Sequence, residues 1–163
     1  MKSRIEPNFK LSGKVVIIGI GNMLRGDDGF GPRLIEKIKG KLDAVCIDAG
    51  TAPENYIGKI VKLKPDTVLI IDVAGLDLQP GEYDISKKED ILKSGFTTHD
   101  ISPHMFIEFL EDQTKAEIFM LGVQPKEVSF GAGMSREVKE ALDKIAELLI
   151  EKSKGDKKCT KRI

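Results

Sequence analysis

Short runs of aliphatic and β-branched residues alternate along this chain with stretches in which apolar residues recur every three or four positions. The first pattern predicts β-strands and the second predicts amphipathic helices. This alternation is typical of an α/β protein. We expect strands over residues 14–20, 44–48, 67–73, 82–85, 118–123 and, as a short one, 128–130. We expect helices over residues 28–39, from 53 to 63, from 102–103 to 110 and from 135 to about 150.

The strand expected at residues 67–73 lacks the polar alternation of a half-exposed strand. Such a strand is buried on both faces and lies centrally in its sheet. The expected fold class is therefore α/β, a three-layer sandwich with a mostly parallel central sheet flanked by helices. The 163 residues form one domain, 1–163, with a core at about 14–150 and a frayed, solvated tail at 151–163. The expected inward helix positions are Leu34, Ile35, Ile38, Phe106, Ile107, Phe109, Leu110, Val138, Leu142, Ile145, Leu148 and Leu149.

Charge and composition narrow the function classes. Lysine and arginine number 26 and aspartate and glutamate number 26, so there is no basic excess of the kind that nucleic-acid binders carry. No apolar run approaches the roughly 20 residues of a membrane span, and the first twelve residues are polar, so we expect a cytoplasmic protein. The two cysteines, Cys46 and Cys159, have no metal-site spacing. No long heptad pattern calls for a partner helix, and we expect a monomer.

The first expected strand runs into a glycine loop that carries two adjacent carboxylates, Asp27 and Asp28, to the start of a helix. Glycine loops at helix N-termini attract phosphate, but these carboxylates would repel it at close range. The loop therefore favours a cation over a nucleotide. The alternative for Asp28 is that it only complements the dipole of the following helix.

Other polar side chains end the neighbouring strands. Asp48 follows the second strand, Asp72 ends the third, and His99 lies in the loop before a later helix. Sites in open parallel sheets form at the carboxyl ends of the strands, and carboxylates with an imidazole suit a divalent transition metal. A buried, unpaired Asp72 would cost free energy, which favours a site role. The alternatives are that Asp48 is a turn residue and that His99 bonds to local backbone.

These residues belong to blocks that together resemble the hydrogenase maturation proteases. The order and spacing of the blocks agree with that family across about residues 14–150. The resemblance implies a phosphorylase/hydrolase-like α/β fold and an endopeptidase, a hydrolase that removes the C-terminal extension of a nickel-iron hydrogenase large-subunit precursor after nickel insertion. It also implies that Asp28, Asp72 and His99 bind the metal. The four blocks span residues 19–31, 48–51, 70–73 and 98–103.

Two carboxylates and one imidazole leave coordination positions open, so the site is able to contact nickel already held by cysteines of the precursor. Nickel then reports that the precursor is ready; whether the resting protein holds a metal of its own is left open. If no metal supplies the nucleophile, Asp28 or Asp72 acts as general base, as in an aspartyl protease. Asp27 either orients this pair or is solvated. The residues expected to bind the extended substrate tail are Gly19, Gly21, Asp27, Asp48, Gly50 and Thr51.

Two other classes stay open at this point. A Rossmann-type nucleotide-binding module would explain the strand, the glycines and the helix. Its dinucleotide fingerprint is broken, however, because Gly19 and Gly21 are followed by Gly26 rather than by a glycine three positions on. A non-enzymatic nickel chaperone could use the same three ligands, and nothing in the local sequence excludes it.

Overall fold

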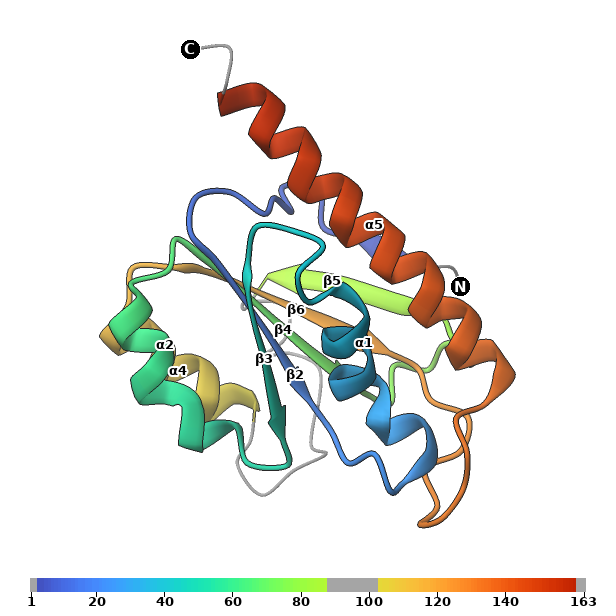
Figure 1. Ribbon diagram of the computed structural model, residues 1–163. Helices are drawn as coiled ribbons and strands as arrows, with labels where there is room; N and C mark the ends of the chain where they lie inside the picture. The colour runs from blue at the N-terminus through green and yellow to red at the C-terminus, as the bar shows by residue number, and fades with distance from the viewer. Residues whose placement is uncertain (1–2, 88–102, 161–163) are drawn as a thin grey trace.

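The computed structural model describes residues 3–87 and 103–160, with the side chains of residues 103, 104 and 155–160 left aside. In these residues six strands form one sheet in the order β1-β5-β6-β4-β2-β3 (Figure 1). Every neighbouring pair is parallel except β5 and β6, so the expected, mostly parallel sheet is confirmed. The strands are β1 (Arg4–Ile5), β2 (Val15–Ile20), β3 (Val45–Gly50), β4 (Thr67–Val73), β5 (Tyr83–Lys87) and β6 (Glu117–Val123).

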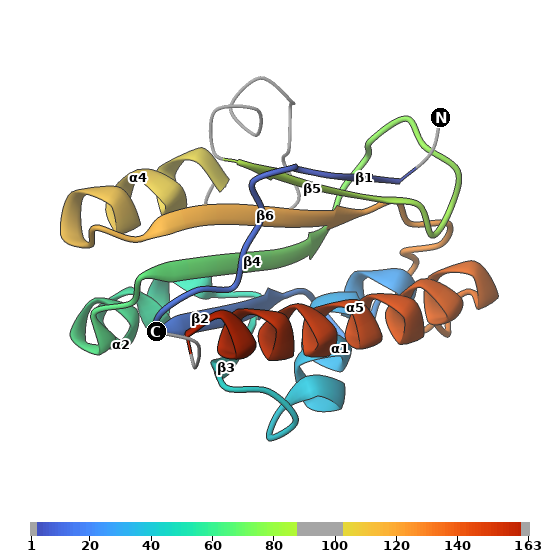
Figure 2. The same cartoon turned by 90° about the horizontal axis from the view of Figure 1, so that it is seen from above.

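Helices cover both faces of the sheet, which confirms the three-layer sandwich. Helices α1 and α5 pack on one face, and α2 and α4 pack on the other (Figures 1 and 2). None of the helices in the described residues has the length and apolar character needed to cross a bilayer. The helical elements are η1 (Gly26–Gly29), α1 (Phe30–Ile38), η2 (Pro53–Tyr56), α2 (Ile57–Leu63), α4 (Pro103–Gln113) and α5 (Arg136–Thr160).

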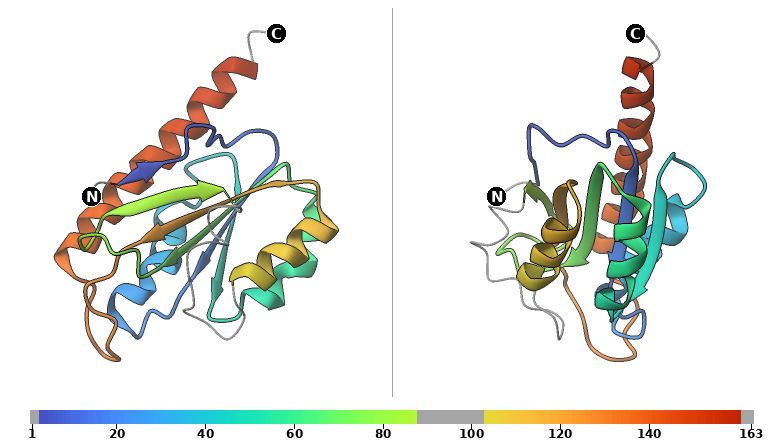
Figure 3. Two further views of the ribbon diagram at one scale, coloured as in Figure 1. Left: turned by 180° about the vertical axis from the view of Figure 1, so that it is seen from behind. Right: turned by 90° about the vertical axis from the view of Figure 1, so that its left-hand side faces the viewer.

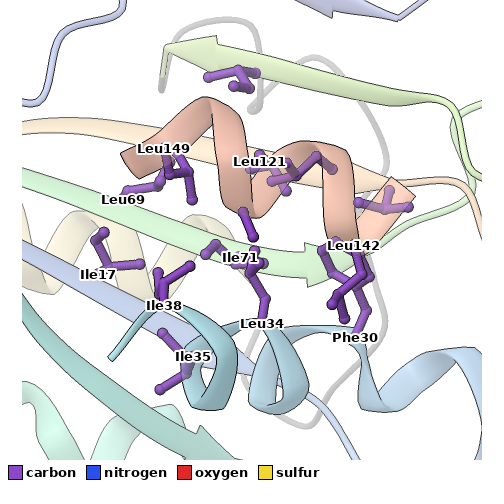
Figure 4. Close-up of a cluster of buried hydrophobic side chains, with 14 of the residues drawn as sticks. Ile17, Phe30, Leu34, Ile35, Ile38, Leu69, Ile71, Leu121, Leu142 and Leu149 are labelled. Atoms are coloured by element: carbon purple, nitrogen blue, oxygen red, sulfur yellow. The ribbon is translucent and has the colours of Figure 1, made fainter. Parts of the chain in front are cut away.

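The two core clusters follow from the alternation of side chains along the central strands. Ile17, Leu69 and Ile71 face α1 and α5 (Figure 4), whereas Val68 and Ile70 face α2 and α4. Because both faces are covered, β4 is buried at each of its positions. The central place predicted for this strand is confirmed, since β4 lies between β6 and β2.

Most predicted helix faces are confirmed, with one clear exception. The expected inward residues of α1 are buried, as are most of those of α5, although Leu148 is half-buried. In α4, Phe106, Ile107 and Leu110 are buried, but Phe109 is 46% exposed, so its prediction as a core residue was wrong. An apolar side chain next to a helical stripe looks the same in sequence whether or not a partner covers it.

Beyond shifts of a few residues at the ends of elements, four features of the fold differ from the prediction. The helix expected at residue 28 begins as the 3-10 turn η1 and becomes α1 at Phe30. The strand expected at residues 128–130 is wrong, because this segment is a loop. β1 was not predicted; its two residues pair with β5. α5 continues to Thr160 where we expected a frayed tail from residue 151, and Lys152 of this helix lies over the Phe9 ring at 5.8 Å.

Candidate functional site

Asp28 and Asp72 lie on two elements that contact each other at the carboxyl edge of the central strands. Gly19 of β2 pairs with Ile71 of β4, so Asp72 is the next residue along β4 as β2 turns into its glycine loop. This loop leads into η1, which carries Asp28 and packs against β4. The structure thus brings Asp28 and Asp72 to one edge of two neighbouring strands, as the parallel topology predicted (Figure 1).

Asp28 is partly buried and is held by the loop that precedes it. Its Oδ2 atom accepts a hydrogen bond from the backbone N–H of Asn22 at 3.0 Å. The side chain of Asn22 in turn accepts one from the N–H of Leu24 at 2.9 Å. These two bonds fold the loop back on itself and fix one oxygen of Asp28 in place. Asp28 lies two residues before α1, so the first turn of α1 contains no acidic residue.

Asp72 is almost completely buried, with 2% of the residue exposed. Its Oδ1 atom accepts a hydrogen bond from the N–H of Val73 at 2.8 Å. Its register partner in β6 is Gly122, which adds no side chain beside it. A buried carboxylate is stable where polar or charged groups compensate its charge; the Val73 N–H is one such group, and a bound cation would be another.

His99 and Asp100 lie outside the described residues, as does most of the block at residues 98–103. Within the part of the chain that the structure describes, no group of three or more histidine, cysteine or acidic side chains is arranged to hold a metal ion. Of the three predicted metal ligands, Asp28 and Asp72 lie in the described residues, whereas His99 does not. Their chemistry fits nickel, since carboxylate oxygens and imidazole nitrogen both bind divalent transition metals. The three-residue set stays a prediction.

Asp27 has a role that the sequence did not reveal. It is fully buried, so the alternative that it is solvated was wrong. Its Oδ2 atom accepts hydrogen bonds from the N–H groups of Lys126 and Glu127 at 2.8 and 2.9 Å and from the Ser135 hydroxyl at 2.9 Å. Its Oδ1 atom accepts one from the N–H of Ser135 at 2.7 Å. Asp27 thus ties η1 to the loop between β6 and α5, where we expected a contact with substrate.

The glycines of the loop serve internal packing. A Cβ atom on Gly19 would lie 2.4 Å from the carbonyl oxygen of Gly31 in α1, and one on Gly21 would lie 1.9 Å from that of Asp28. The open sides of both glycines are therefore occupied by the protein's own backbone, where we expected a substrate tail. The same crowding leaves no room there for the close approach of a pyrophosphate, which weighs against a Rossmann-type site.

Asp48, Gly50 and Thr51 form a turn at the end of β3. Asp48 is exposed, and its Oδ1 atom accepts the N–H of Gly50 at 3.0 Å. This contact is typical of a turn residue, which was the alternative interpretation of Asp48. The Gly50 N–H, which we expected to donate to substrate, is already used, and the Gly50 carbonyl accepts from the N–H of Gly21 at 2.8 Å. Thr51 is exposed, and its contact with substrate stays a prediction.

Comparison with known proteins places this chain in a family. A sequence model of the hydrogenase maturation protease family matches residues 32–152. The chain is 35% identical over 161 residues to a putative hydrogenase maturation protease of Methanocaldococcus jannaschii, covering 93% of this chain and 95% of the relative. It is 37% identical over 137 residues to the hydrogenase 3 maturation protease of Escherichia coli K12, covering 82% and 87%.

Solved structures lead to the same family. The crystal structure of a [NiFe] hydrogenase maturation protease, HycI from Thermococcus kodakarensis KOD1, superposes with a TM-score of 0.80 at 33% identity, covering 86% of this chain and 92% of that one. The solution structure of an endopeptidase, HycI from Escherichia coli, superposes with a TM-score of 0.74 at 35% identity, covering 83% and 88%. The chain therefore belongs to the hydrogenase maturation protease family, and it is a hydrolase of the endopeptidase class.

Proposed function

We propose that this enzyme removes the C-terminal extension of a nickel-iron hydrogenase large-subunit precursor after nickel insertion, and that it recognises the nickel held by the precursor. One observation carries the proposal. Asp28 and Asp72 lie 44 positions apart in the sequence, on elements that contact each other at the carboxyl edge of β2 and β4. Family membership supports the maturation protease activity, and this pair of carboxylates supports a metal as the recognised element.

Nickel belongs to the substrate in this proposal. Asp28, Asp72 and His99 would offer two carboxylates and one imidazole to an ion whose remaining ligands come from the precursor. A precursor without nickel then lacks the group that these three side chains recognise. Cleavage is gated by nickel loading, and peptide sequence alone does not suffice.

The two carboxylates have different surroundings, and this suggests a division of labour. Asp28 is partly exposed and has one oxygen held by the Asn22 N–H, so it is the more accessible to water. We assign proton abstraction to Asp28: it takes a proton from a water molecule whose oxygen attacks the scissile carbonyl carbon. The proton then passes to the leaving amide nitrogen as the peptide bond breaks. Asp72, buried at the end of β4, orients the nickel-bearing end of the substrate.

The test is cleavage of a nickel-loaded precursor by site variants, read by mass spectrometry. We expect Asp28→Asn to lower kcat by at least about a hundredfold, in line with loss of a general base. Asp72→Asn and His99→Ala are expected to abolish cleavage of the loaded precursor, so that neither precursor is processed. Asp112→Asn is the matched control, because Asp112 is an exposed acid of α4 that is not among the residues expected to bind substrate. Full activity of Asp28→Asn would overturn the assignment of this site.

We also expect the enzyme to act in the cytoplasm. We expect it to be a monomer, because the proposed reaction needs no partner other than the precursor. Sedimentation of the purified protein tests the oligomeric state.

A further inference from the structure

Exposed apolar side chains gather on two loops beside Asp28. In the described residues, six large hydrophobic side chains are strongly exposed, and four of them lie on these loops. The loop after β2 carries Met23, 43% exposed, and Leu24, 62% exposed. The loop between β6 and α5 carries Val128, 38% exposed, and Phe130, 76% exposed. We call these four side chains the two-loop surface.

One backbone hydrogen bond and one side-chain hydrogen bond join the two loops. The N–H of Gly131 donates to the carbonyl of Leu24 at 2.8 Å, and the Arg25 guanidinium donates to the carbonyl of Val128 at 3.2 Å. Figures 1 and 3 show the loop between β6 and α5 running alongside the loop that follows β2. Leu24 and Phe130 are therefore neighbours in space although 106 positions separate them in sequence.

The two-loop surface is also held rigidly. The buried Asp27 carboxylate accepts the N–H groups of Lys126, Glu127 and Ser135, which lie on both sides of Phe130. Glu127 in turn accepts from both the hydroxyl and the N–H of Ser129. A loop that is already ordered loses little conformational entropy on binding, so its exposed apolar side chains contribute more to affinity.

The size and charge of the surface indicate the kind of partner. Four side chains at these exposures present a few hundred Å² of apolar area, which is the range of functional patches on monomers. A stable dimer buries about 800 Å² on each partner, so this surface suits a transient complex. Its flanking charges are mixed, with Arg25 and Lys126 beside Glu127, and the chain carries no net charge. Recognition here is therefore apolar, without long-range electrostatic steering.

We infer that the two-loop surface binds an apolar patch on the folded body of the hydrogenase large-subunit precursor, outside the extension that is removed. This inference rests on the proposed function, because the precursor is the protein that must come to the site. Leu24 precedes Asp28 by four residues in one loop, so a protein seated on the surface lies next to the carboxylate. Two contacts then select the substrate. The nickel site recognises that nickel has been inserted, and the two-loop surface recognises the precursor protein that carries the nickel.

The test separates docking from chemistry with a matched pair of phenylalanines. Phe130→Ala removes the most exposed side chain of the surface, and Phe109→Ala removes an exposed phenylalanine on α4. We expect Phe130→Ala to raise KM for the loaded precursor about tenfold with kcat within twofold, as loss of uniform binding does. Phe109→Ala should change neither constant. Leu24→Ala should act in the same direction as Phe130→Ala.

Binding of the precursor to the Asp28→Asn protein, with and without Phe130→Ala, tests docking without cleavage. Equal affinities would overturn the inference even if the wild-type enzyme cleaves the precursor. Normal docking by wild-type enzyme that never cleaves would overturn the proposed function and leave the inference standing. If Phe130→Ala converts a dimer to a monomer in sedimentation while KM stays unchanged, a second copy covers the surface and the inference is wrong.

Discussion

Replacing Asp27 by alanine removes an acceptor on which four hydrogen bonds converge in a fully buried position. Its donors are the backbone N–H groups of Lys126, Glu127 and Ser135 and the hydroxyl of Ser135. The Asp27 N–H itself donates to the carbonyl of Glu127 at 2.8 Å and is unaffected by the substitution. The change therefore cuts the side-chain part of the link between η1 and the loop before α5.

The magnitude follows from the number and the kind of these bonds. A hydrogen bond to a charged group contributes about 1.5–3 kcal/mol, and an orphaned buried donor costs a similar amount. Lys126 and Glu127 are exposed residues, so water can reach part of the freed loop and reduce the loss. We expect Asp27→Ala to lower the free energy of unfolding by about 3–5 kcal/mol, a large part of the 5–15 kcal/mol typical of a domain.

Asparagine at this position gives an internal check. Oδ2 of Asp27 accepts three hydrogen bonds and Oδ1 accepts one. An asparagine that places its oxygen at the Oδ2 position keeps three bonds and turns its NH₂ group toward the Ser135 N–H. Asp27→Asn should therefore cost about half as much as Asp27→Ala.

Urea unfolding followed by circular dichroism measures both variants. With a slope of about 2 kcal/mol per molar urea, Asp27→Ala should lower the midpoint by about 2 M. Asp48→Ala is the control, because Asp48 is exposed and accepts one local hydrogen bond; it should cost about 1 kcal/mol or less. Amide hydrogen exchange at Lys126, Glu127 and Ser135 should accelerate in Asp27→Ala. A midpoint equal to that of the control would refute the stabilising role of the Asp27 hydrogen bonds.

Two further predictions concern packing and ionisation. Gly19→Ala should lower the free energy of unfolding by about 2 kcal/mol or more in urea titration, because its Cβ would lie 2.4 Å from a carbonyl oxygen of α1. Gly58 lies in α2 with open space around it, so Gly58→Ala should raise the free energy of unfolding by about 0.5–1 kcal/mol. Equal effects of the two substitutions would contradict the packing argument. Burial raises the pKa of the Cys46 thiol, against a smaller opposing effect of the Lys39 charge, so less thiolate is present at pH 8. Iodoacetamide should therefore alkylate Cys46 more slowly in native protein than in urea, and equal rates by mass spectrometry would contradict this.

The parts of the fold that the sequence predicted are those with local signals. The continuous apolar run of β4 indicated burial on both faces, and the central place of this strand followed. Parallel strands share one carboxyl edge, so Asp28 and Asp72 could be placed together before any coordinates. The family resemblance, carried by four separated blocks, pointed to the class of enzyme that the comparisons then showed.

The parts that could not be predicted depend on contacts between distant residues. The donors to Asp27 lie 99 to 108 positions away, and the sequence around Asp27 carries no signal that predicts them. We expected Gly19 to contact the substrate, because the sequence does not reveal which group packs against a glycine. The short strand expected at Val128–Phe130 has an alternating pattern, but among the described residues no strand pairs with it, and it forms a loop. There its apolar side chains are exposed.

Nickel-gated cleavage can be tested with two forms of one precursor. The purified enzyme is incubated with matched nickel-loaded and nickel-free hydrogenase large-subunit precursor, and the products are weighed by mass spectrometry. We predict loss of a C-terminal peptide from the loaded precursor alone, and no loss from either precursor with Asp28→Asn or His99→Ala. Equal cleavage of both precursors would contradict recognition of nickel. An intact precursor whose nickel moves to this protein would contradict the protease role itself and favour a nickel chaperone.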